Sequence, residues 1–431
     1  MRQKTIVLFY PQNLLSHYLR CISIAKQLGE DYDVFFVGSK NYNRFVEKEH
    51  FLIIENNSIA IDEVVQKAMS FDFSWINKGN LEKAFLNDLE IIERCKPDII
   101  VGDANLSLRM VAEKMHVFYV AVENNYLSNR YSDIRPVPHT HKAWNFRDKM
   151  SDANWENLIS FVEKIVLRSV HKPFRYLRKK YGLSQQRNLL DEFEGDVVLL
   201  LDNPDIFPLG ALESNKFCIG PQLYRNEGSE AEIKTWIQER KHRKTIYVSM
   251  GSSADVEKNT YFMKHLSTSE FNVIFSGNGN CVTDTVFSKQ FINFTEIAEY
   301  IDVYVCHGGN GSIYQALFHA IPLLMIPSIF EQEWNVHRIV KLNLGSVHYP
   351  EKGITDFLKK LNIQISRKDS TATSAMKNKL LEGKQYHDVS EIFEQIRRQL
   401  FPADYPQTGI GNNSVQDKKL ISENITTEPL C

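Results

Sequence analysis

Residues 302–335 read DVYVCHGGNGSIYQALFHAIPLLMIPSIFEQEWN, and this stretch specifies the architecture of the chain. Its opening apolar run, VYVC, stands between a charged residue and a glycine pair, which predicts a buried parallel strand. A glycine-rich turn follows at residues 307–312, and Ser312 is the expected N-cap of a helix over residues 313–319. A second apolar run, residues 323–326 between two prolines, predicts the next strand. The stretch is therefore a strand–turn–helix–strand unit of an α/β protein.

The N-terminus of that helix points at the glycine turn, and this arrangement suits a phosphate. A helix N-terminus carries partial positive charge and free N–H groups, and glycines let the backbone approach a ligand closely. His307 and Ser312 add two side-chain donors at the same place. On their own the glycines are a weak signal, because glycines also punctuate ordinary α/β turns. Glu331 and Gln332 then follow a strand end, where open α/β sheets bind ligands, so that the whole suits a nucleotide-sugar.

The same stretch resembles the donor-binding signature of family 1 glycosyltransferases, the UDP-glycosyltransferase-like enzymes, and especially the bacterial macrolide and antibiotic type. Their pattern HGGxGSxxEAL…P…P…(D/E)Q…N is matched in order and approximate spacing. The matching residues are His307, Gly308, Gly309, Gly311, Ser312, Ala316, Leu317, Pro322, Pro327, Glu331, Gln332 and Asn335. The chain departs from the pattern at Gln315, where many relatives have a glutamate that binds both ribose hydroxyls. Glutamine can still hydrogen-bond a hydroxyl, without the charge.

The resemblance implies the GT-B fold, in which two Rossmann-like, doubly wound domains face each other across a cleft. It also implies where the donor binds, with the base near Phe291, although the Trp-x-Pro-Gln-like form of the family is absent there. A phosphate-type turn at Gly251-Ser252-Ser253 is expected to help the main turn. The expected donor-binding residues are Ser252, Phe291, His307, Gly309, Asn310, Gly311, Ser312, Gln315, Glu331 and Gln332.

Length and composition bound the class of protein. A chain of 431 residues exceeds the usual size of one core, so two domains are expected. Hydrophobic residues make up 43% and charged residues 24%, as in ordinary globular proteins, and a net charge of −2 gives no electrostatic case for nucleic acid. The six scattered cysteines lack metal or CxxC spacing and favour reduced thiols. No apolar run approaches the ~18 residues of a membrane span, and no signal-peptide region precedes the first strand, so we expect a cytoplasmic protein that is free to contact membranes peripherally.

Repeated strand–helix–strand passes predict a parallel, doubly wound sheet in each half of the chain. We expect an N-terminal acceptor-binding domain over residues 1–221, a linker over 222–243 and a C-terminal donor-binding domain over 244–385. A helix over residues 386–402 is expected to cross back to the first domain, as the resemblance implies, and the polar residues 403–431 are expected to be disordered.

Two segments of the first half are expected to shape the acceptor pocket, as they do in the resembling family. They are the polar-aromatic loop at residues 123–141 and the amphipathic helical region at residues 144–181. A loop of this length inside a compact domain is usually functional, and an ordinary surface excursion is the alternative. Among the local elements, we also expect Ser16 to cap the first helix, a helix over residues 256–266 and a short strand over residues 291–294.

Transfer of a sugar to a hydroxyl needs a base for the acceptor proton and a group that holds the leaving diphosphate. His17 is the candidate base, because it lies just inside the first helix, where the helix N-terminus disfavours the imidazolium. Asp103 ends another parallel strand at the same sheet edge and can fix the tautomer of the imidazole, as in a hydrolase triad. By position the two resemble the catalytic histidine and aspartate of family 1. A lone histidine after a first strand is often structural, and it is the donor signature that favours catalysis.

The predicted function is therefore an inverting glycosyltransferase that moves a sugar from a UDP- or dTDP-sugar to a hydroxyl of a small-molecule acceptor, such as a natural product. One in-line displacement needs no nucleophilic carboxylate, and the sequence shows no metal-binding cluster, so neither metal nor cofactor is expected. Two alternatives stay open. The acceptor could be lipid-linked and met at a membrane surface, with basic residues between 168 and 180 as the contact, or the chain could be a catalytically degenerate donor-binding accessory protein. The acceptor, the sugar, the nucleotide and the oligomeric state are not specified by the sequence.

Overall fold

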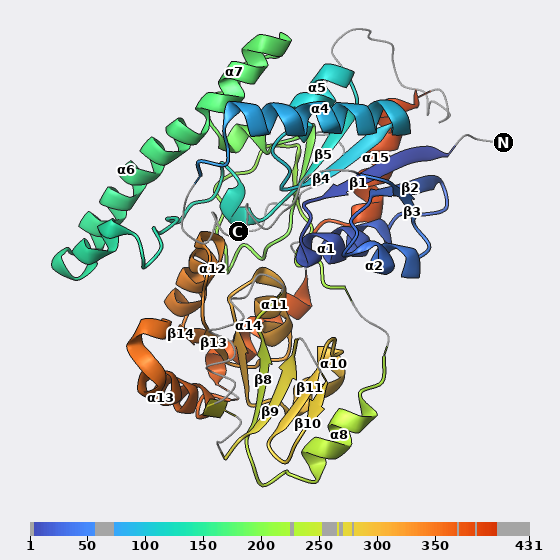
Figure 1. The fold of residues 1–431 in the computed structure, drawn as a ribbon. Coiled ribbons are helices and arrows are strands. Elements are labelled where there is room, and N and C mark those ends of the chain that lie inside the picture. The colour runs from blue at the N-terminus through green and yellow to red at the C-terminus, as the bar shows by residue number, and fades with distance from the viewer. Residues whose placement is uncertain are drawn as a thin grey trace.

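The computed structural model describes residues 4–56, 73–224, 228–251, 265–266, 270–277, 280–368, 370–383 and 386–402. In this part of the chain the strands form two sheets of seven, stacked one above the other in Figure 1. The predicted tail over residues 403–431 and nearly all of the predicted helix over residues 256–266 lie outside the described residues. The two units below are named after their sheets, the first unit and the second unit.

The first sheet has the strand order β3-β2-β1-β4-β5-β6-β7, and all its strand pairs are parallel. Its strands read as nearly continuous apolar runs because helices cover both faces of the sheet. The strands are β1 (Thr5–Pro11), β2 (Tyr32–Val37), β3 (Leu52–Ile54), β4 (Ile99–Asp103), β5 (Phe118–Glu123), β6 (Val197–Leu200) and β7 (Lys216–Cys218).

Helices cover the two faces of the first sheet in separate groups. Helices α1 and α2, joined by α15 from the end of the chain, contribute to the core on one face, and α4, α5 and α7 contribute to the core on the other. The helices of this unit are α1 (Leu15–Ala25), α2 (Asn43–Lys48), α4 (Lys78–Cys95), α5 (Leu108–Met115), α6 (Asp152–Val170) and α7 (Lys172–Tyr181), with short 3-10 helices at Asn125–Leu127, Lys142–Lys149 and Leu190–Glu192.

The second sheet repeats this plan with the order β10-β11-β9-β8-β12-β13-β14. Its strands pair in parallel, except that the edge strand β10 runs antiparallel to β11. The strands are β8 (Thr245–Ser249), β9 (Asn272–Ser276), β10 (Cys281–Val282), β11 (Val286–Lys289), β12 (Val303–Cys306), β13 (Leu323–Met325) and β14 (Gly345–Val347).

The helices of the second unit also pack on two faces. Helices α8, α10, α11, α12 and α14 contribute to one core, and α13 packs on the opposite face. Tyr126 and Phe207 of the first unit are buried in the first of these cores, so the two units share apolar contacts. The helices are α8 (Ala231–Gln238), α10 (Phe294–Ile297), α11 (Asn310–Phe318), α12 (Phe330–Lys341), α13 (Gly353–Ile365) and α14 (Thr371–Glu382), with 3-10 helices at Ala298–Tyr300 and Pro350–Lys352.

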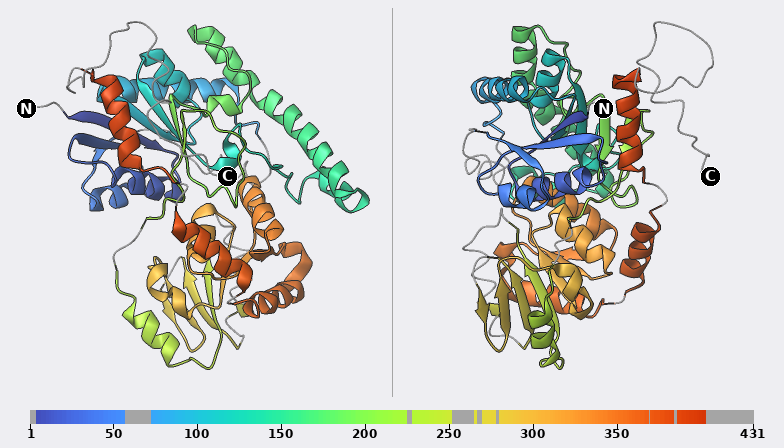
Figure 2. Two further views of the ribbon diagram at one scale, coloured as in Figure 1. Left: turned by 180° about the vertical axis from the view of Figure 1, so that it is seen from behind. Right: turned by 90° about the vertical axis from the view of Figure 1, so that its right-hand side faces the viewer.

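The last helix, α15 (Val389–Leu400), returns to the first unit, and both views in Figure 2 show it alongside that unit. Its apolar face, which includes Phe393, is buried in the core on the α1 side of the first sheet. The return crosses the chain where it leaves the first unit: the His387 amide donates to the Cys218 carbonyl at 2.7 Å. Gly220, at φ 71, leaves room for the ring of Tyr386, which a Cβ there would meet at 2.8 Å. The two crossings between the units are therefore packed against each other.

Strand order fixes where the functional residues lie. In each sheet the order reverses beside the first strand, between β1 and β4 in the first unit and between β8 and β12 in the second. Open α/β sheets bind ligands at such a switch point, beyond the carboxyl ends of the strands. Asp103 ends β4, and His17 follows β1, so the two predicted catalytic residues flank the first switch point. His307 directly follows β12 at the second one.

Three local predictions are wrong. The strand expected at residues 291–294 lies earlier, at Val286–Lys289, where it pairs with β9, and Phe294 begins helix α10 instead. Ser312 is not an N-cap, because α11 already begins at Asn310 with Gly309 as the extended cap residue. Ser16 is likewise inside α1, whose cap position is occupied by Leu14.

Candidate functional site

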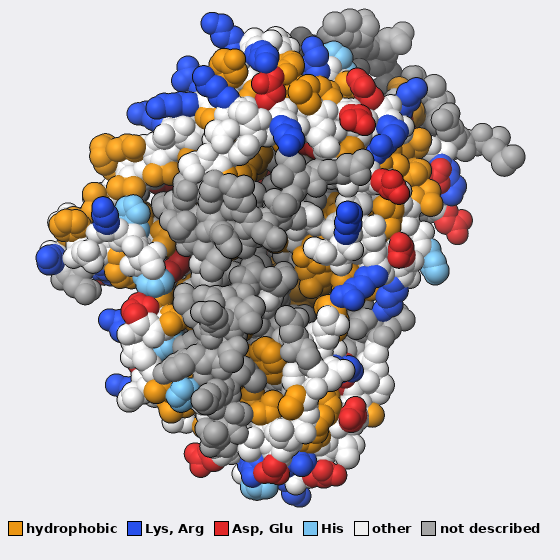
Figure 3. Space-filling view, viewed as in Figure 1, with side chains coloured by type: hydrophobic (Ala, Val, Ile, Leu, Met, Phe, Trp, Pro, Cys, Tyr) orange, Lys and Arg blue, Asp and Glu red, His pale blue; other side chains and the backbone are white. Residues whose placement is uncertain are grey.

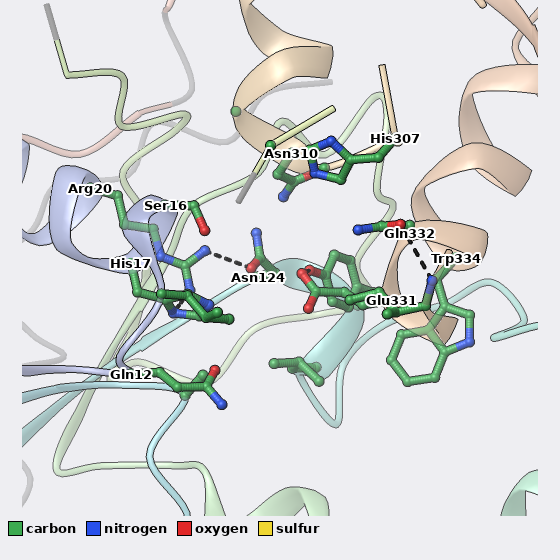
Figure 4. A pocket seen from close by; sticks show the side chains of 18 of the residues that line it. Gln12, Ser16, His17, Arg20, Asn124, His307, Asn310, Glu331, Gln332 and Trp334 are labelled. Carbon is green, nitrogen blue, oxygen red and sulfur yellow. Dashed lines mark hydrogen bonds between the residues drawn. The ribbon is translucent and has the colours of Figure 1, made fainter. Parts of the chain in front are cut away.

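A cavity of about 640 Å³ lies between the two units and receives residues from the carboxyl ends of both sheets. Figure 4 shows its polar groups: His17 and Arg20 lie on one side, Glu331 and Gln332 on the other, and Asn124 lies between them. His307 and Asn310 approach from the second unit. The residues predicted to act on the acceptor and on the donor therefore share one cavity.

His17 and Asp103 form a buried pair at the first switch point. Nδ1 of His17 lies 3.0 Å from Oδ1 of Asp103, and the side chains are 7% and 0% exposed. The backbone supports this approach, because the Gln12 amide donates to the Asp103 carbonyl at 3.1 Å and so joins the ends of β1 and β4. The structure thus brings together the two residues that the sequence pairs as base and orienting carboxylate.

Arg20 is a third member of this cluster, and it is not among the site residues predicted from the sequence. Its Nε donates to Oδ2 of Asp103 at 2.5 Å, its Nη2 donates to Oδ1 of the same carboxylate, and Nη2 lies 2.9 Å from Nδ1 of His17. The signal was present in the sequence, because a residue three positions after His17 on a helix lies on the same face. Burial raises the pKa of Asp103, but the charges of Arg20 and His17 outweigh it and hold that pKa at about 2.

A hydrogen-bonded chain continues from Arg20 to the second unit. Nη1 of Arg20 donates to Oδ1 of Asn124 at 2.8 Å, and Nδ2 of Asn124 donates to Oδ2 of Asp202 at 3.2 Å. Oδ1 of Asp202 then accepts from Nδ2 of Asn310 at 2.7 Å and from the hydroxyl of Tyr314 at 3.0 Å. Burial raises the pKa of Asp202 to about 6, although these hydrogen bonds act in the other direction. The predicted base is therefore linked to the first turn of α11 through fixed polar contacts.

The donor turn is built tightly around the ring of His307. A Cβ at Gly251 would lie 2.5 Å from Cε1 of that ring, and a Cβ at Gly309 would lie 2.4 Å from Nε2, so glycine is required at both positions. Burial lowers the pKa of His307 to about 4, with a hydrogen bond to the backbone of Ser249 acting in the opposite direction. The imidazole is therefore neutral near pH 7, and its one N–H is used in the hydrogen bond to Ser249.

Helix α11 begins in the same turn and presents its N-terminus to the cavity. Asn310, Gly311 and Ser312 form its first turn and line the cavity, and Gly309 is the residue before them. Gln315, one turn further on, also lines the cavity and accepts from the hydroxyl of Tyr304 at 3.2 Å. Free N–H groups and the helix dipole make this end of α11 a suitable place for an anion.

Glu331 and Gln332 line the cavity at the start of α12, but both also have protein partners. Oε1 of Glu331 accepts from the hydroxyl of Tyr126, and Oε1 of Gln332 accepts from the amide of Ser328 at 2.8 Å and from that of Ile329 at 3.3 Å. Gln332 therefore caps the helix as well as facing the cavity.

Phe291 lines the cavity, and it also contacts the first unit. Its ring centroid lies 5.7 Å from that of Phe45, and the guanidinium of Arg44 lies 4.8 Å from it. Ser252, the remaining predicted donor residue, lies outside the described residues.

The predicted acceptor segments line the cavity on the first unit, and the loop is anchored on the second unit. Nε1 of Trp334 donates to the carbonyl of Pro136 at 2.9 Å, and Arg338 pairs with Asp133. These segments contribute a mainly apolar wall. The lining residues from residues 123–181 are Asn124, Tyr126, Leu127, Arg135, Val137, Ile159, Val162, Glu163, Val166, Leu167 and Val170.

Within the described ranges, no group of three or more His, Cys, Asp or Glu side chains is placed to hold a metal ion. None of the helices among these residues is long and apolar enough to span a membrane. The expectation of a reaction without metal stays a prediction.

Similarity to known proteins covers most of the chain. The model of the glycosyltransferase family 28 C-terminal domain matches residues 231–393. A PGL/p-HBAD biosynthesis glycosyltransferase of Mycobacterium tuberculosis (strain ATCC 25177 / H37Ra) is 24% identical over 361 residues, which cover 80% of each chain. A PGL/p-HBAD biosynthesis rhamnosyltransferase of Mycobacterium bovis (strain BCG / Pasteur 1173P2) is 24% identical over 357 residues, which cover 80% of this chain and 76% of the relative.

Solved structures show the fold. The glycosyltransferase of kitacinnamycin superposes with a TM-score of 0.64 at 15% identity and covers 92% of this chain and 100% of its own. The spinosyn rhamnosyltransferase complexed with thymidine diphosphate superposes with a TM-score of 0.61 at 12% identity, covering 91% and 100%. These matches, together with the two parallel sheets, confirm the GT-B fold that the sequence predicts.

Proposed function

We propose that this chain, a glycosyltransferase with the GT-B fold whose residues 231–393 match the family 28 C-terminal domain, is an inverting enzyme that glycosylates a hydroxyl of an apolar acceptor. The donor is a nucleotide-diphosphate sugar. One observation carries the proposal: the His17–Asp103 pair and the N-terminus of α11 line the same cavity from opposite units.

The acceptor side of the cavity supports an apolar acceptor. Between the base and the outer wall the lining is mainly aliphatic and aromatic, and few charged groups interrupt it. An apolar body would bury favourably against this wall, at roughly 25 cal/mol per Å² of apolar surface. Its hydroxyl would then be the one polar group that needs a partner at the inner end, where His17 lies.

His17 acts as the general base in this proposal. Its Nδ1 faces Asp103 and Arg20, which leaves Nε2 as the nitrogen that takes the acceptor proton. The carboxylate of Asp103 holds the ring orientation and stabilises the imidazolium that forms. General base catalysis of this type contributes typically about 10²–10⁴-fold.

The second unit holds the leaving group. The acceptor oxygen bonds to C1 of the sugar as the bond from C1 to the diphosphate oxygen breaks, on the opposite face, which inverts the anomeric centre. The diphosphate departs with the electron pair of that bond. Its negative charge meets the backbone N–H groups at the start of α11 and the hydroxyl of Ser312, and the neutral ring of His307 shapes the turn beside them. Phe291 is proposed to contact the base, and Gln315, Glu331 and Gln332 the sugar hydroxyls.

A thermal-shift panel of nucleoside diphosphates and nucleotide-sugars tests the donor site directly. A ligand at 100 times its dissociation constant adds about 2.7 kcal/mol to the free energy of unfolding, which gives a clear rise in melting temperature. We expect a shift with a uridine or thymidine diphosphate that is lost in His307→Ala and kept in His242→Ala, an exposed histidine. A panel without any shift would contradict the proposed donor site.

Turnover separates the enzyme from a donor-binding accessory protein. With the nucleotide identified, donor consumption is measured with apolar phenols and macrolide aglycones, and the configuration of the product is read by NMR. An inverted glycoside supports the mechanism, and a retained one contradicts it. Donor binding without transfer to any acceptor would favour the degenerate alternative.

A further inference from the structure

Helix α6 has two faces with different surroundings. The inner face carries apolar residues, Ile159, Val162 and Val166 among them, that line the acceptor side of the cavity. The helix is anchored by Trp155, which is 4% exposed and packs edge-on against Trp144 at 5.9 Å between ring centroids. In Figure 1 α6 and α7 run along the outside of the first unit. One side of α6 is thus part of the cavity wall, and the other faces solvent.

The outer face of α6 is apolar at its centre. Phe161 is 62% exposed and Ile165 is 51% exposed, and they are separated by one helical turn. Lys164 and Arg168 are exposed on the same face, at positions i+3 and i+7 from Phe161. Large apolar side chains are also exposed elsewhere among the described residues, as at Leu381, but singly exposed apolar residues are normal and need no explanation.

Basic residues extend this face onto α7. Lys172, Arg175 and Lys179 are exposed there, and within the described residues no ion pair involves any of them or Lys164 or Arg168. The carboxylate nearest in sequence is Glu163 of α6, and it pairs with Arg135 at the cavity side. Figure 3 shows hydrophobic and Lys or Arg side chains next to one another over the region of α6 and α7. We call Phe161, Lys164, Ile165, Arg168, Lys172, Arg175 and Lys179 the α6–α7 face.

The composition of the α6–α7 face indicates what kind of partner it binds. Exposed aromatic and aliphatic side chains ringed by unpaired cations match the boundary of an anionic bilayer, where apolar groups enter the acyl region and cations meet lipid phosphates. A partner protein with a complementary face would need both an apolar centre and an acidic ring. A bilayer supplies both at any contact point, and it is also where an apolar acceptor accumulates.

We propose that the α6–α7 face docks on an anionic lipid surface, so that the acceptor side of the cavity lies one helix away from the bilayer. Phe161 and Ile165 enter the lipid, and the basic residues contact the head groups. Docking rests on this face alone and holds whether or not the proposed transfer reaction is correct, since it is measured as lipid binding. If the transfer is correct, the acceptor reaches the cavity from the membrane.

Flotation with lipid vesicles tests the proposal. The full chain is mixed with vesicles of phosphatidylcholine, with or without phosphatidylglycerol, and its vesicle-bound fraction is measured at low and high salt. We expect binding to the anionic vesicles that weakens with salt, and little binding to phosphatidylcholine alone. Strong binding to phosphatidylcholine alone would overturn the anionic part of the proposal, and no binding to either would overturn all of it.

Paired variants assign the binding to this face. Loss of one cation near an anionic bilayer weakens binding about 5-fold, so Lys164→Glu with Arg168→Glu should weaken it by at least roughly 30-fold. Phe161→Ser with Ile165→Ser removes the apolar centre of the face and should abolish flotation. The matched control is Lys359→Glu with Ile363→Ser, an exposed basic and apolar pair at the same i, i+4 spacing on α13. Equal loss in the control, or none in the α6 variants, would contradict the assignment.

Two further measurements keep the result specific. Circular dichroism and melting temperature show whether each variant is folded, and both should match the unmodified protein because every changed side chain is exposed. Phe161→Trp with brominated lipids then reports contact directly: fluorescence quenching on anionic vesicles supports insertion of α6. Absence of quenching while the protein floats would show that another surface binds. Sedimentation without lipid tests whether the face instead joins two copies, and a dimer lost in the Phe161→Ser, Ile165→Ser variant would overturn the proposal.

Discussion

The polar groups at the two switch points differ in how fully they are hydrogen-bonded. At the first switch point His17, Asp103 and Arg20 contact one another, and Arg20 continues to Asn124. At the second, buried polar atoms have no hydrogen-bond partner among the described residues: Nδ1 of His307, Oδ1 of Asn310 and Oδ1 of Asn335.

Buried polar atoms are nearly always satisfied in folded proteins, so a group of unsatisfied ones needs a reason. His307 and Asn310 line the cavity, where hydroxyl groups of a bound nucleotide-sugar would donate to Nδ1 of His307 and Oδ1 of Asn310. In the cluster of His17, Asp103 and Arg20 the partners are already present, and the base is held before any substrate arrives. A catalytic group must be held in place before the substrate binds. A binding turn instead needs polar atoms that are free to hydrogen-bond the ligand.

The largest expected effect comes from the preorganised side. His17→Ala should lower kcat by about 10²–10⁴-fold, because the acceptor proton then has no base. Donor affinity should be unchanged, since His17 lies on the opposite side of the cavity from α11. Steady-state kinetics and a donor thermal shift measure the two quantities. A parallel loss of donor binding would mean that the two sides are not separate in function.

A smaller effect is expected from Arg20→Met. The carboxylate of Asp103 would lose the cation that contacts both its oxygens, so we expect kcat to fall about 10–100-fold, with the donor KM unchanged and partial rescue in Arg20→Lys. The low pKa of Asp103 stabilises the fold above pH ~4 and loses this effect as the pH falls towards 2. Without Arg20 that pKa rises, so acid unfolding should begin at a higher pH. Unchanged acid unfolding would show that Arg20 does not hold the carboxylate.

The unsatisfied side gives a binding effect instead. Asn310→Ala removes an amide at the start of α11 and should weaken donor binding about 10-fold, or about 1.4 kcal/mol, while kcat changes less. Titration calorimetry with the nucleoside diphosphate measures this, and Asn362→Ala on the exposed part of α13 is the control. A variant that binds more tightly would show that Asn310 opposes the ligand.

The last effect is on stability instead of on turnover or donor binding, and it concerns an unsatisfied group away from the cavity. Both oxygens of Glu123 are buried without a partner in the described part of the chain, and burial raises its pKa to about 8, although the charge of Lys216 acts in the other direction. Its folded pKa lies above the unfolded value, so its contribution to stability is lost as the pH rises from ~4 through 8. Glu123→Gln should therefore be more stable than the unmodified protein at pH 9, by about 1–3 kcal/mol, with little difference near pH 5. Thermal melts of the variant and the unmodified protein between pH 5 and pH 9 measure this difference. If activity also falls, Glu123 has a role beyond the fold.

Much of this comparison was predictable from the sequence. Parallel strands place their carboxyl ends at one edge, so His17 and Asp103 were expected to meet although 86 positions separate them, and they do. The turn at His307 could be predicted because a run of glycines between a strand and a helix has few other structural roles. Ser312 was misplaced because Asn310, Gly311 and Ser312 are all acceptable at a helix start, and only the extended backbone of Gly309 shows where α11 begins.

The position of Arg20 beside His17 could be read from local sequence, but its contacts onward to Asp202 could not. Arg20 meets Asp103 and Asn124, which are 83 and 104 positions away, and Asp202 meets Tyr314 across 112 positions. Such contacts depend on how the two units are set against each other and on the rotamers of long side chains. The strand at Val286–Lys289 was misplaced for a related reason, because pairing with β9 selects it over the neighbouring apolar residues.

The return of α15 to the first unit has a mechanical meaning. Two segments join the units, and they touch where the ring of Tyr386 packs on Gly220 and its hydroxyl accepts from Nδ2 of Asn203 at 2.7 Å. The two connections between the units are therefore joined at one point, which restricts sliding of one unit past the other. A change in the width of the cavity would also have to break the contacts that join the units elsewhere, such as Arg338 with Asp133 and Nε1 of Trp334 with the carbonyl of Pro136. A bulkier residue at Gly220 would displace the ring of Tyr386, and so change how the units meet without touching His17 or α11.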